Sequence, residues 1–241
     1  MSNSIKTYIL FSKREVKRVS QVDLLQSYFP ASKIIEPIFP EFQKVPFLNK
    51  IIQASKNKTG KALLTNEVGV FMSHRKIWEE IAKQPTVDKH YLVLESDSRI
   101  QNINIIEEQF SAIENQYDLF FWGAWNNHVS IKKSTRSYLD KNYYIGTPLI
   151  RSVYGAYGYS LNAKTATYLL SVTKKLLYPV DLYKHYIDTS KIRIGAIRPE
   201  VIGTWQTTDS TIRKETNFDK IKRILIIKIF NTRNQILAYF C

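Results

Sequence analysis

The feature that most constrains the fold is an alternation of short apolar runs with segments of helical periodicity. The apolar runs have the length and residue types of buried strands, and they comprise residues 6–11, 33–39, 91–94, 117–125, 154–161 and 191–197. The segments that read as helices are residues 14–28, 66–83 and 163–175. The order strand, helix, strand, helix, strand predicts an α/β domain with a mostly parallel central sheet flanked by helices.

Two asparagines and two polar stretches set the expected boundaries of these elements. Asn66 and Asn162 stand where a helix N-cap is needed. Residues 40–62 are polar, and we expect a long loop there; residues 126–150 are polar with scattered aromatics, and we expect another loop or a small excursion.

The strand at residues 91–94 ends on two carboxylates, within the stretch HYLVLESDSRI. Residues two apart in an extended chain point the same way, so Glu95 and Asp97 can reach one site while Ser96 faces elsewhere. Ligands of open α/β sheets bind beyond the carboxyl ends of the strands. The pair therefore predicts a Mg²⁺ or Mn²⁺ site completed by phosphate oxygens. A solvated turn is the alternative, and for an acidic pair taken alone it is the commoner structure.

Other polar residues are candidates for binding or proton transfer. His74 lies on the apolar stripe of the 66–83 helix, which is typical of a core histidine, although its pairing with Arg75 favours anion or ribose binding. Asp181 follows Pro179 and Val180 and is either a helix cap or a general base for a hydroxyl group. The segment 204–213 (TWQTTDSTIR) resembles a binding loop and equally an ordinary polar turn.

Composition narrows the classes of function. The 241 residues carry 35 Lys and Arg against 21 Asp and Glu, a net charge of +14, which favours nucleic acid, an anionic membrane or phosphorylated small molecules. The single cysteine, Cys241, excludes an internal disulfide and a Cys-type zinc site, and this fits a cytoplasmic protein. We find no GxxxxGK, GxGxxG, Gly-x-Ser-x-Gly or HExxH motif, which counts against P-loop and hydrolase functions.

The C-terminal residues 214–241 differ from the preceding 1–213, which we expect to form the main domain. They interleave Lys and Arg with Ile, Leu and Phe, as in FDKIKRILIIKIF. A basic amphipathic segment of this kind lies in an anionic membrane interface or packs as a helix or strand with a solvated basic face. The first alternative predicts a peripheral protein on the inner face of the cell membrane.

Several motifs, in order, resemble glycosyltransferase family 25, the lipooligosaccharide and collagen-type galactosyltransferase family. They are NEVGVFMSHRKIWEEI, YLVLESDSRI, YDLFFWGAW, GAYGYSLNAKTATYLL, PVD and QTTDSTI. The resemblance covers residues 5–213, and its first two motifs are the most specific. The chain departs from the family pattern at Ser96, where the family has a middle acid, and at Val70, where it usually has cysteine.

The resemblance implies a GT-A-like, Rossmann-like fold and an inverting transfer from a nucleotide sugar to a sugar hydroxyl. UDP-galactose is the family's usual donor, and glucose or an N-acetylhexosamine is an alternative sugar. The acceptor would be a saccharide or lipid-linked glycan in bacterial lipooligosaccharide or surface-polysaccharide synthesis.

The resemblance also assigns roles to individual residues. The acidic motif would bind Mn²⁺ or Mg²⁺ through Glu95 and Asp97, and the departure at Ser96 weakens this expectation without removing it. The acceptor hydroxyl also needs a base on the face opposite the leaving group, for which Asp181 is the first candidate and Asp209 the second. His185, four residues after Asp181, could share its helix face and contact donor or acceptor. The expected donor-binding residues are Ser73, His74, Arg75, Glu95, Ser96, Asp97 and Gln206.

Two other functions fit parts of the sequence. The +14 charge and 15 tyrosines favour a basic nucleic-acid-binding protein, but the basic residues are spread along the chain without a recognisable motif, so we expect no nucleic-acid partner. Ser96 favours an inactive relative that binds sugar nucleotides without transferring the sugar.

Overall fold

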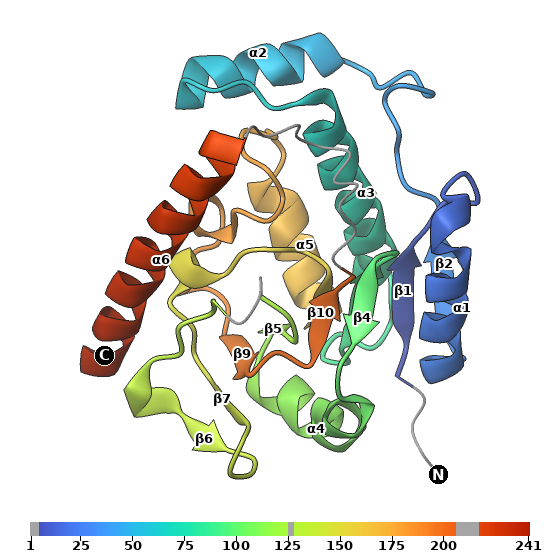
Figure 1. Ribbon diagram of the computed structural model, residues 1–241. Coiled ribbons are helices and arrows are strands. Elements are labelled where there is room, and N and C mark those ends of the chain that lie inside the picture. Colours follow the sequence, from blue (N-terminus) through green and yellow to red (C-terminus); the bar gives the residue numbers. More distant parts are fainter. Residues whose placement is uncertain (1–4, 125–127, 206–216) are drawn as a thin grey trace.

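The computed structural model describes residues 5–124, 128–205 and 217–241, and the side chains of the last segment from Ile229 onward. Within this part, eight strands form one sheet in the order β2-β1-β3-β8-β5-β9-β7-β6, and a two-stranded sheet pairs β10 with β4 (Figure 1). The strands are β1 (Thr7–Leu10), β2 (Ser32–Ile35), β3 (Tyr91–Glu95), β4 (Ser98–Ile100), β5 (Leu119–Phe121), β6 (Ser137–Tyr138), β7 (Tyr144–Gly146), β8 (Gly158–Leu161), β9 (Ile194–Arg198) and β10 (Ile202–Thr204).

Strand direction confirms the expected sheet. β1 runs parallel to β2 and β3, and β5 runs parallel to β9. β8 lies antiparallel between β3 and β5, and β7 lies antiparallel between β9 and β6. Six of the eight strands described for the larger sheet therefore run one way, with β7 and β8 opposed, so the domain has a mostly parallel mixed sheet.

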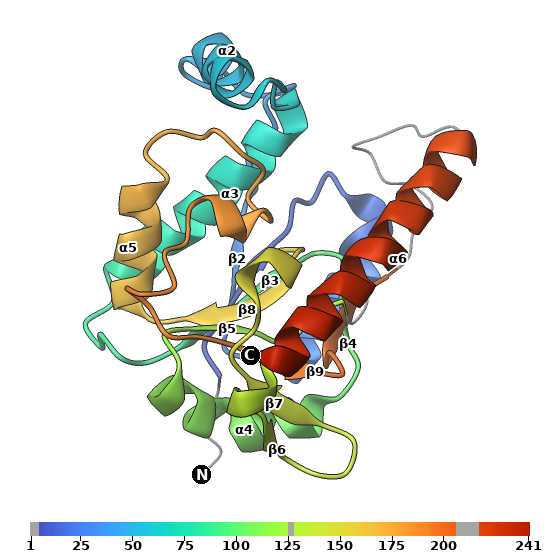
Figure 2. The ribbon, with the colours of Figure 1, turned by 90° about the vertical axis from the view of Figure 1, so that its left-hand side faces the viewer.

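Helices cover both faces of this sheet (Figures 1 and 2). The described α-helices are α1 (Val19–Tyr28), α2 (Leu48–Thr59), α3 (Thr65–Ala82), α4 (Ile103–Gln116), α5 (Ala163–Val172) and α6 (Asn217–Phe240). α3 and α5 pack on one face with Tyr91 and Val93 of β3, whereas α1 and α4 pack on the other with Leu92 and Leu94. Alternate residues of one continuous apolar run thus enter two different cores, as expected for a strand buried on both sides.

Side-chain hydrogen bonds at the N-termini of α5 and α3 help to fix where these helices begin. Asn162 Oδ1 accepts a hydrogen bond from Thr165 N at 2.8 Å, which confirms the predicted cap of α5. α3 begins one residue earlier than predicted, and Asn66 lies inside it. Instead, the Glu67 carboxylate accepts a hydrogen bond from Leu64 N at 2.8 Å, which satisfies a backbone group that the helix itself leaves free.

The expected loop at residues 40–62 is wrong in part, because α2 occupies its second half. Few apolar residues mark this helix, and it ends at Gly60, whose φ of 77° suits a glycine cap. The buried Ser55 Oγ donates to Leu177 O at 2.8 Å and ties α2 to the chain after α5. Sequence periodicity misses α2 because a few polar anchors, rather than an apolar stripe, hold it.

The basic C-terminal segment forms α6, which runs along the outside of the molecule (Figure 2). Its inner side meets the domain through Phe230, whose ring centroid lies 6.3 Å from that of Tyr154, and through Asn231, 2.7 Å from a ring nitrogen of His128. Among the described helices, none combines the length and apolar character that crossing a bilayer requires.

Candidate active site

The acidic motif lies at the carboxyl edge of the parallel strands, where the sequence predicts a ligand site. Glu95 ends β3 beside Leu10 at the end of β1. The chain then turns at residues 96–97 into β4, which pairs with β10, and Trp205 N donates to Asp97 O at 2.9 Å. Both strand ends and β10 therefore fix the backbone on which the two carboxylates stand.

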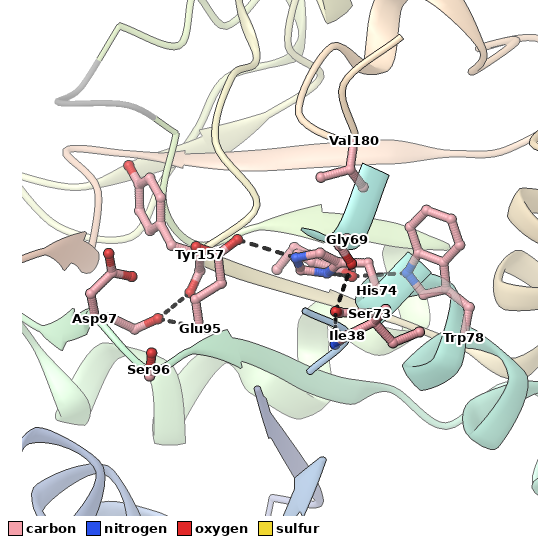
Figure 3. Close-up of polar contacts among 12 residues, drawn as sticks. Ile38, Gly69, Ser73, His74, Trp78, Glu95, Ser96, Asp97, Tyr157 and Val180 are labelled. Atoms are coloured by element: carbon pink, nitrogen blue, oxygen red, sulfur yellow. Dashed lines mark hydrogen bonds and ion pairs between the residues drawn. The ribbon is translucent and has the colours of Figure 1, made fainter. Parts of the chain in front are cut away.

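Glu95 is held from the side of α3 by a buried polar chain (Figure 3). Its Oε1 lies 3.1 Å from His74 Nε2, and His74 Nδ1 lies 2.9 Å from the hydroxyl of Tyr159. Trp78 Nε1 donates to that same hydroxyl at 2.8 Å. The structure thus brings together His74 and Glu95, which were predicted from different motifs, and adds Trp78 and Tyr159, which were not predicted as site residues.

Arg18, from the 3-10 helix Val16–Arg18, contacts the motif from the other side. Its Nη1 donates to Ser96 Oγ at 2.7 Å, and its Nη2 lies 3.5 Å from Asp97 Oδ2. Glu15 lies 3.2 Å from the same guanidinium. Arg18 was not predicted, because a lone arginine in a basic stretch gives no signal until the fold places it beside the carboxylates.

Asp97 carries charge that its surroundings only partly compensate. Burial and the neighbouring charge of Glu95 raise the pKa of Asp97 to about 6, against the opposing effect of Arg18. Its Oδ1 is buried and has no hydrogen-bond partner in the described part of the chain. An unpaired buried carboxylate oxygen beside a second carboxylate is what a cation site needs before the cation is bound.

Two carboxylates fit a metal ion that also binds substrate phosphate. Within residues 5–124, 128–205 and 217–241 no group of three or more His, Cys, Asp or Glu side chains is arranged to hold a metal. A Mg²⁺ or Mn²⁺ ion bound by Glu95 and Asp97 would therefore take its other ligands from water or a diphosphate, which is common for these cations.

The other residues of the Ser-His-Arg motif make structural contacts. Ser73 is buried; its Oγ accepts from Ile38 N at 2.8 Å and donates to Gly69 O at 2.7 Å (Figure 3). Arg75 Nη1 donates to Thr173 O at 2.9 Å and Thr173 Oγ1 at 2.6 Å, at the end of α5. Through these hydrogen bonds, neither Ser73 nor Arg75 contacts Glu95 as His74 does.

Asp181 lies near a group of buried tyrosines. Burial raises the pKa values of Tyr183 and Tyr186, and the charge of Asp181 raises both further. The charge of Glu95 also raises the pKa of Tyr183, so Tyr183 senses both carboxylates. Its hydroxyl is buried without a hydrogen-bond partner among the described residues. The structure therefore puts Asp181 and Glu95 within electrostatic reach of one buried phenol.

His185 does not share a helix face with Asp181, and that expectation is wrong. Asp181 precedes the 3-10 helix Tyr183–His185, which is too short for an i, i+4 pair. His185 is exposed, and its ring stacks on Tyr178 with 4.0 Å between centroids. The other two predicted site residues, Gln206 and Asp209, lie outside the described residues.

A hollow of about 770 Å³ lies at the opposite edge of the sheet, where β5 and β9 begin. Asp118, Lys164 and Arg193 contribute to its lining. Arg193 there is paired with Asp118 at 2.8 Å. The hollow lies away from the acidic motif, so it does not bear on the site at Glu95 and Asp97.

Comparison with known proteins gives a family and distant structural likenesses to solved structures. The family model described as glycosyltransferase family 25 (LPS biosynthesis protein) matches residues 32–184, a range that includes His74, Glu95, Asp97 and Asp181. No match was found among curated proteins. The solved structure of a mannose-1-phosphate geranyltransferase from Thermus thermophilus is similar with 11% identity and a TM-score of 0.34, over 82% of this chain and 74% of that one.

Proposed function

The chain belongs to glycosyltransferase family 25, the family of LPS biosynthesis proteins, and from that premise we propose that it moves a hexose from a UDP-sugar to a saccharide hydroxyl with inversion. One observation carries the proposal beyond the family. The acidic pair stands at the carboxyl edge of the sheet, with one unpaired buried oxygen on Asp97, among the described residues, and a buried hydrogen-bonded support behind Glu95.

The donor diphosphate would lie against Glu95, Asp97 and Arg18. A Mn²⁺ or Mg²⁺ ion held by the two carboxylates would supply charge neutralisation for the leaving nucleoside diphosphate. Arg18 can donate to phosphate oxygens from the same edge of the site, since it already lies within 3.5 Å of Asp97. Ser96 is neutral and accepts a hydrogen bond from Arg18. A third carboxylate at this position would compete with the donor phosphate for the guanidinium.

The acceptor hydroxyl needs a base that faces the sugar opposite the leaving group. Asp181 is our choice. Its charge, like that of Glu95, raises the pKa of the buried Tyr183. It lies on a loop rather than on the strands that carry the donor-side carboxylates. Asp209 remains the second candidate. The side chain of His185 is exposed and close to this loop, where it can contact an incoming saccharide.

A thermal-shift experiment tests donor and metal together. We expect UDP-sugars to raise the Tm of the wild type more in the presence of Mn²⁺ than in its absence, with UDP-galactose compared against UDP-glucose and UDP-N-acetylhexosamines. Asp97→Ala should lose the Mn²⁺ effect, whereas Glu107→Ala, at an exposed carboxylate of α4, should keep it. Stabilisation by no nucleotide sugar contradicts the donor proposal, and a Mn²⁺ effect that survives Asp97→Ala places the metal elsewhere.

The reaction itself is tested with the stabilising donor and a panel of saccharide and lipid-linked acceptors. Transfer with the opposite anomeric configuration in product and donor, followed by NMR, supports inversion. Asp181→Asn should lower kcat by about 10²–10⁴-fold, the range for removal of a general base, with little change in donor affinity. A fully active Asp181→Asn enzyme makes Asp209 the base to test next, and donor binding without transfer to any acceptor favours the inactive-relative alternative.

We also propose that α6 holds the protein on an anionic membrane, where a lipid-linked acceptor would be found. Ile229, Arg233, Ile236 and Phe240 recur at helical spacing on its outer side, and all four are exposed. Ile229 and Ile236, with Thr232 and Leu237, also line a hollow on that side. An exposed apolar stripe with a basic residue on it, in a chain of net charge +14, matches the chemistry of an anionic lipid surface.

Liposome flotation at physiological salt tests the membrane proposal. The wild type should float with vesicles containing anionic lipid and should not float with purely zwitterionic ones. Ile236→Glu, on the stripe, should weaken binding about tenfold or more, while Gln235→Glu, an exposed neighbour with the same added charge, should have a much smaller effect. Equal losses in the two variants would mean that charge alone, and not the apolar stripe, accounts for binding.

A further inference from the structure

The chain of buried polar groups behind Glu95 has a definite order of donors and acceptors. Trp78 Nε1 is solely a donor, and it donates to the Tyr159 hydroxyl at 2.8 Å. His74 Nδ1 lies 2.9 Å from the same oxygen, and His74 Nε2 lies 3.1 Å from Glu95 Oε1. Burial raises the pKa of Tyr159 far above its usual range, so its phenol keeps its proton and needs an acceptor for it.

One proton arrangement satisfies every group in this chain. The Tyr159 hydrogen goes to His74 Nδ1, because the tyrosine's other described partner, the indole of Trp78, can only donate. Nδ1 is then an acceptor, so the imidazole proton stands on Nε2 and is donated to Glu95 Oε1. A proton on Nδ1 would leave the phenol hydrogen without an acceptor in a dry site, at a cost of about 1–3 kcal/mol.

This series of hydrogen-bonded side chains is rigid as well as ordered. His74 and Trp78 are 0% exposed and Tyr159 is 1% exposed, so water does not compete for these hydrogen bonds. His74 and Trp78 are four residues apart on α3, which directs both side chains at the same hydroxyl. Tyr159 stands on β8, paired with β3, the strand that ends in Glu95.

We propose that His74 is a positioning residue that, as the Nε2–H tautomer set by Trp78 and Tyr159, locks Glu95 Oε1 and turns Oε2 toward the ligand. His74 is then not a donor-binding residue itself, because both of its ring nitrogens are used within the protein. The tautomer stands on the hydrogen bonds alone, whereas the role toward a ligand rests on the proposed function, in which Glu95 binds the metal. Outer groups of this kind typically change metal affinity by about 10–100-fold when they are removed.

The tautomer is tested in the intact wild type by ¹⁵N–¹H NMR of protein with labelled histidine. The four histidines are assigned by single substitution. We expect the His74 signals of an imidazole protonated at Nε2 and unprotonated at Nδ1 at about pH 7.5, and a loss of this single pattern in Tyr159→Phe. An Nδ1-protonated or doubly protonated His74 in the wild type would overturn the proposal without any variant having to fold.

The positioning role is tested with two substitutions of the same residue. His74→Gln can still place an amide N–H near the Nε2 position, whereas His74→Asn places its amide near Nδ1 and leaves Glu95 unsupported. With Mn²⁺ alone as the probe, followed by EPR of the free ion, His74→Asn should bind about 10–100-fold more weakly and His74→Gln within about threefold of wild type. Equal affinity in all three proteins would overturn the positioning role. If wild type binds no Mn²⁺, the metal proposal fails, while the NMR result still decides the tautomer.

Discussion

At the scale of single residues, the candidate site is a place where stability is given up for binding. Asp97 is partly buried beside Glu95, and its buried Oδ1 lacks a hydrogen-bond partner within the described residues. Burying an unpaired charged oxygen next to a like charge is unfavourable for the folded state. Such a residue is retained where a ligand provides the missing partner.

Asp97→Asn should therefore make the protein more stable and less able to bind metal. We expect the free energy of unfolding at about pH 7.5 to rise by roughly 1–2 kcal/mol, because a neutral amide removes the repulsion from Glu95 and costs less to bury. Urea denaturation without divalent ions measures this change, and Mn²⁺ titration should show binding lost in parallel. A destabilised Asp97→Asn would instead identify the ion pair with Arg18 as a structural contact.

His90 gives a second residue-scale prediction, on pH. Its Nε2 lies 3.0 Å from Tyr117 O and its Nδ1 lies 3.0 Å from Ser160 Oγ, which accepts from Trp122 Nε1. Burial lowers the pKa of His90 to about 4, so the folded state holds the neutral ring while the unfolded state takes up a proton below about pH 6.5. The contribution of His90 to stability is then lost as the pH falls from about 6.5 to about 4, by about 3 kcal/mol, while protonation of Asp97, whose pKa is raised to about 6, stabilises the folded state over an overlapping interval.

Urea unfolding at intervals between about pH 7.5 and about pH 4 measures this loss. His90→Gln keeps a side chain that can donate to Tyr117 O but does not titrate, so its stability should fall less steeply across the same interval. His185→Gln is the matched comparison: this histidine is exposed, and its pKa is also lowered, by partial burial and the charge of Lys184, so the slope should change in the same direction but by less than in His90→Gln. Equal slopes in wild type and His90→Gln would contradict the assignment.

At the scale of elements, the apolar runs that become β1, β2, β3, β5, β8 and β9 and the periodic segments that become α1, α3 and α5 are predicted from sequence pattern. The elements not predicted are α2, α4, β4, β6, β7 and β10. The apolar run at residues 91–94 predicts a doubly buried strand because both of its faces meet helices in the fold. α2 and Arg18 escape prediction because their partners, Leu177 and the residues of the acidic turn, are distant in sequence. Glu95 and His74 are predicted from two separate motifs, but that they touch depends on the packing of α3 against β3 and β8.

The close approach of the chain after β5 to β10 gives an element-scale prediction at Gly123. A Cβ at this position would lie 2.0 Å from Ile202 O and 2.4 Å from the Tyr157 ring. Since β10 pairs with β4 directly after Asp97, we expect Gly123→Ala to displace the acidic turn and to cost about 3 kcal/mol. Gly60→Ala is the comparison: it meets no atom within 4 Å but has a φ of +77°, so its cost should be about 1 kcal/mol. Thermal unfolding of the two variants should give this order, and the reverse order would contradict it.

At the scale of the whole molecule, the sheet domain has its own apolar cores, whereas α6 packs on the outside of that domain. Both apolar cores are built from residues before 206, and among the described residues no side chain of α6 belongs to either. α6 instead touches the domain through contacts such as Phe230 with Tyr154, Asn231 with His128, and the Cys241 carbonyl, which accepts from Ser134. Its outer stripe is left to another surface, for which we propose the membrane.

Removal of α6 should therefore leave a folded domain that has lost its membrane affinity. A chain ending at residue 216 is expected to unfold cooperatively, with a loss of about 2–4 kcal/mol, or roughly 5–15 °C in Tm, because no described side chain of α6 belongs to either apolar core. Circular dichroism melting measures the first expectation and flotation with anionic vesicles the second. Thermal shift with UDP-sugars and Mn²⁺ should still detect donor binding, since Glu95, Asp97 and Arg18 lie within the retained sheet domain. If the shortened chain loses cooperative unfolding, α6 is an integral part of the domain, and its outer stripe would have to be tested by single substitutions in the full chain.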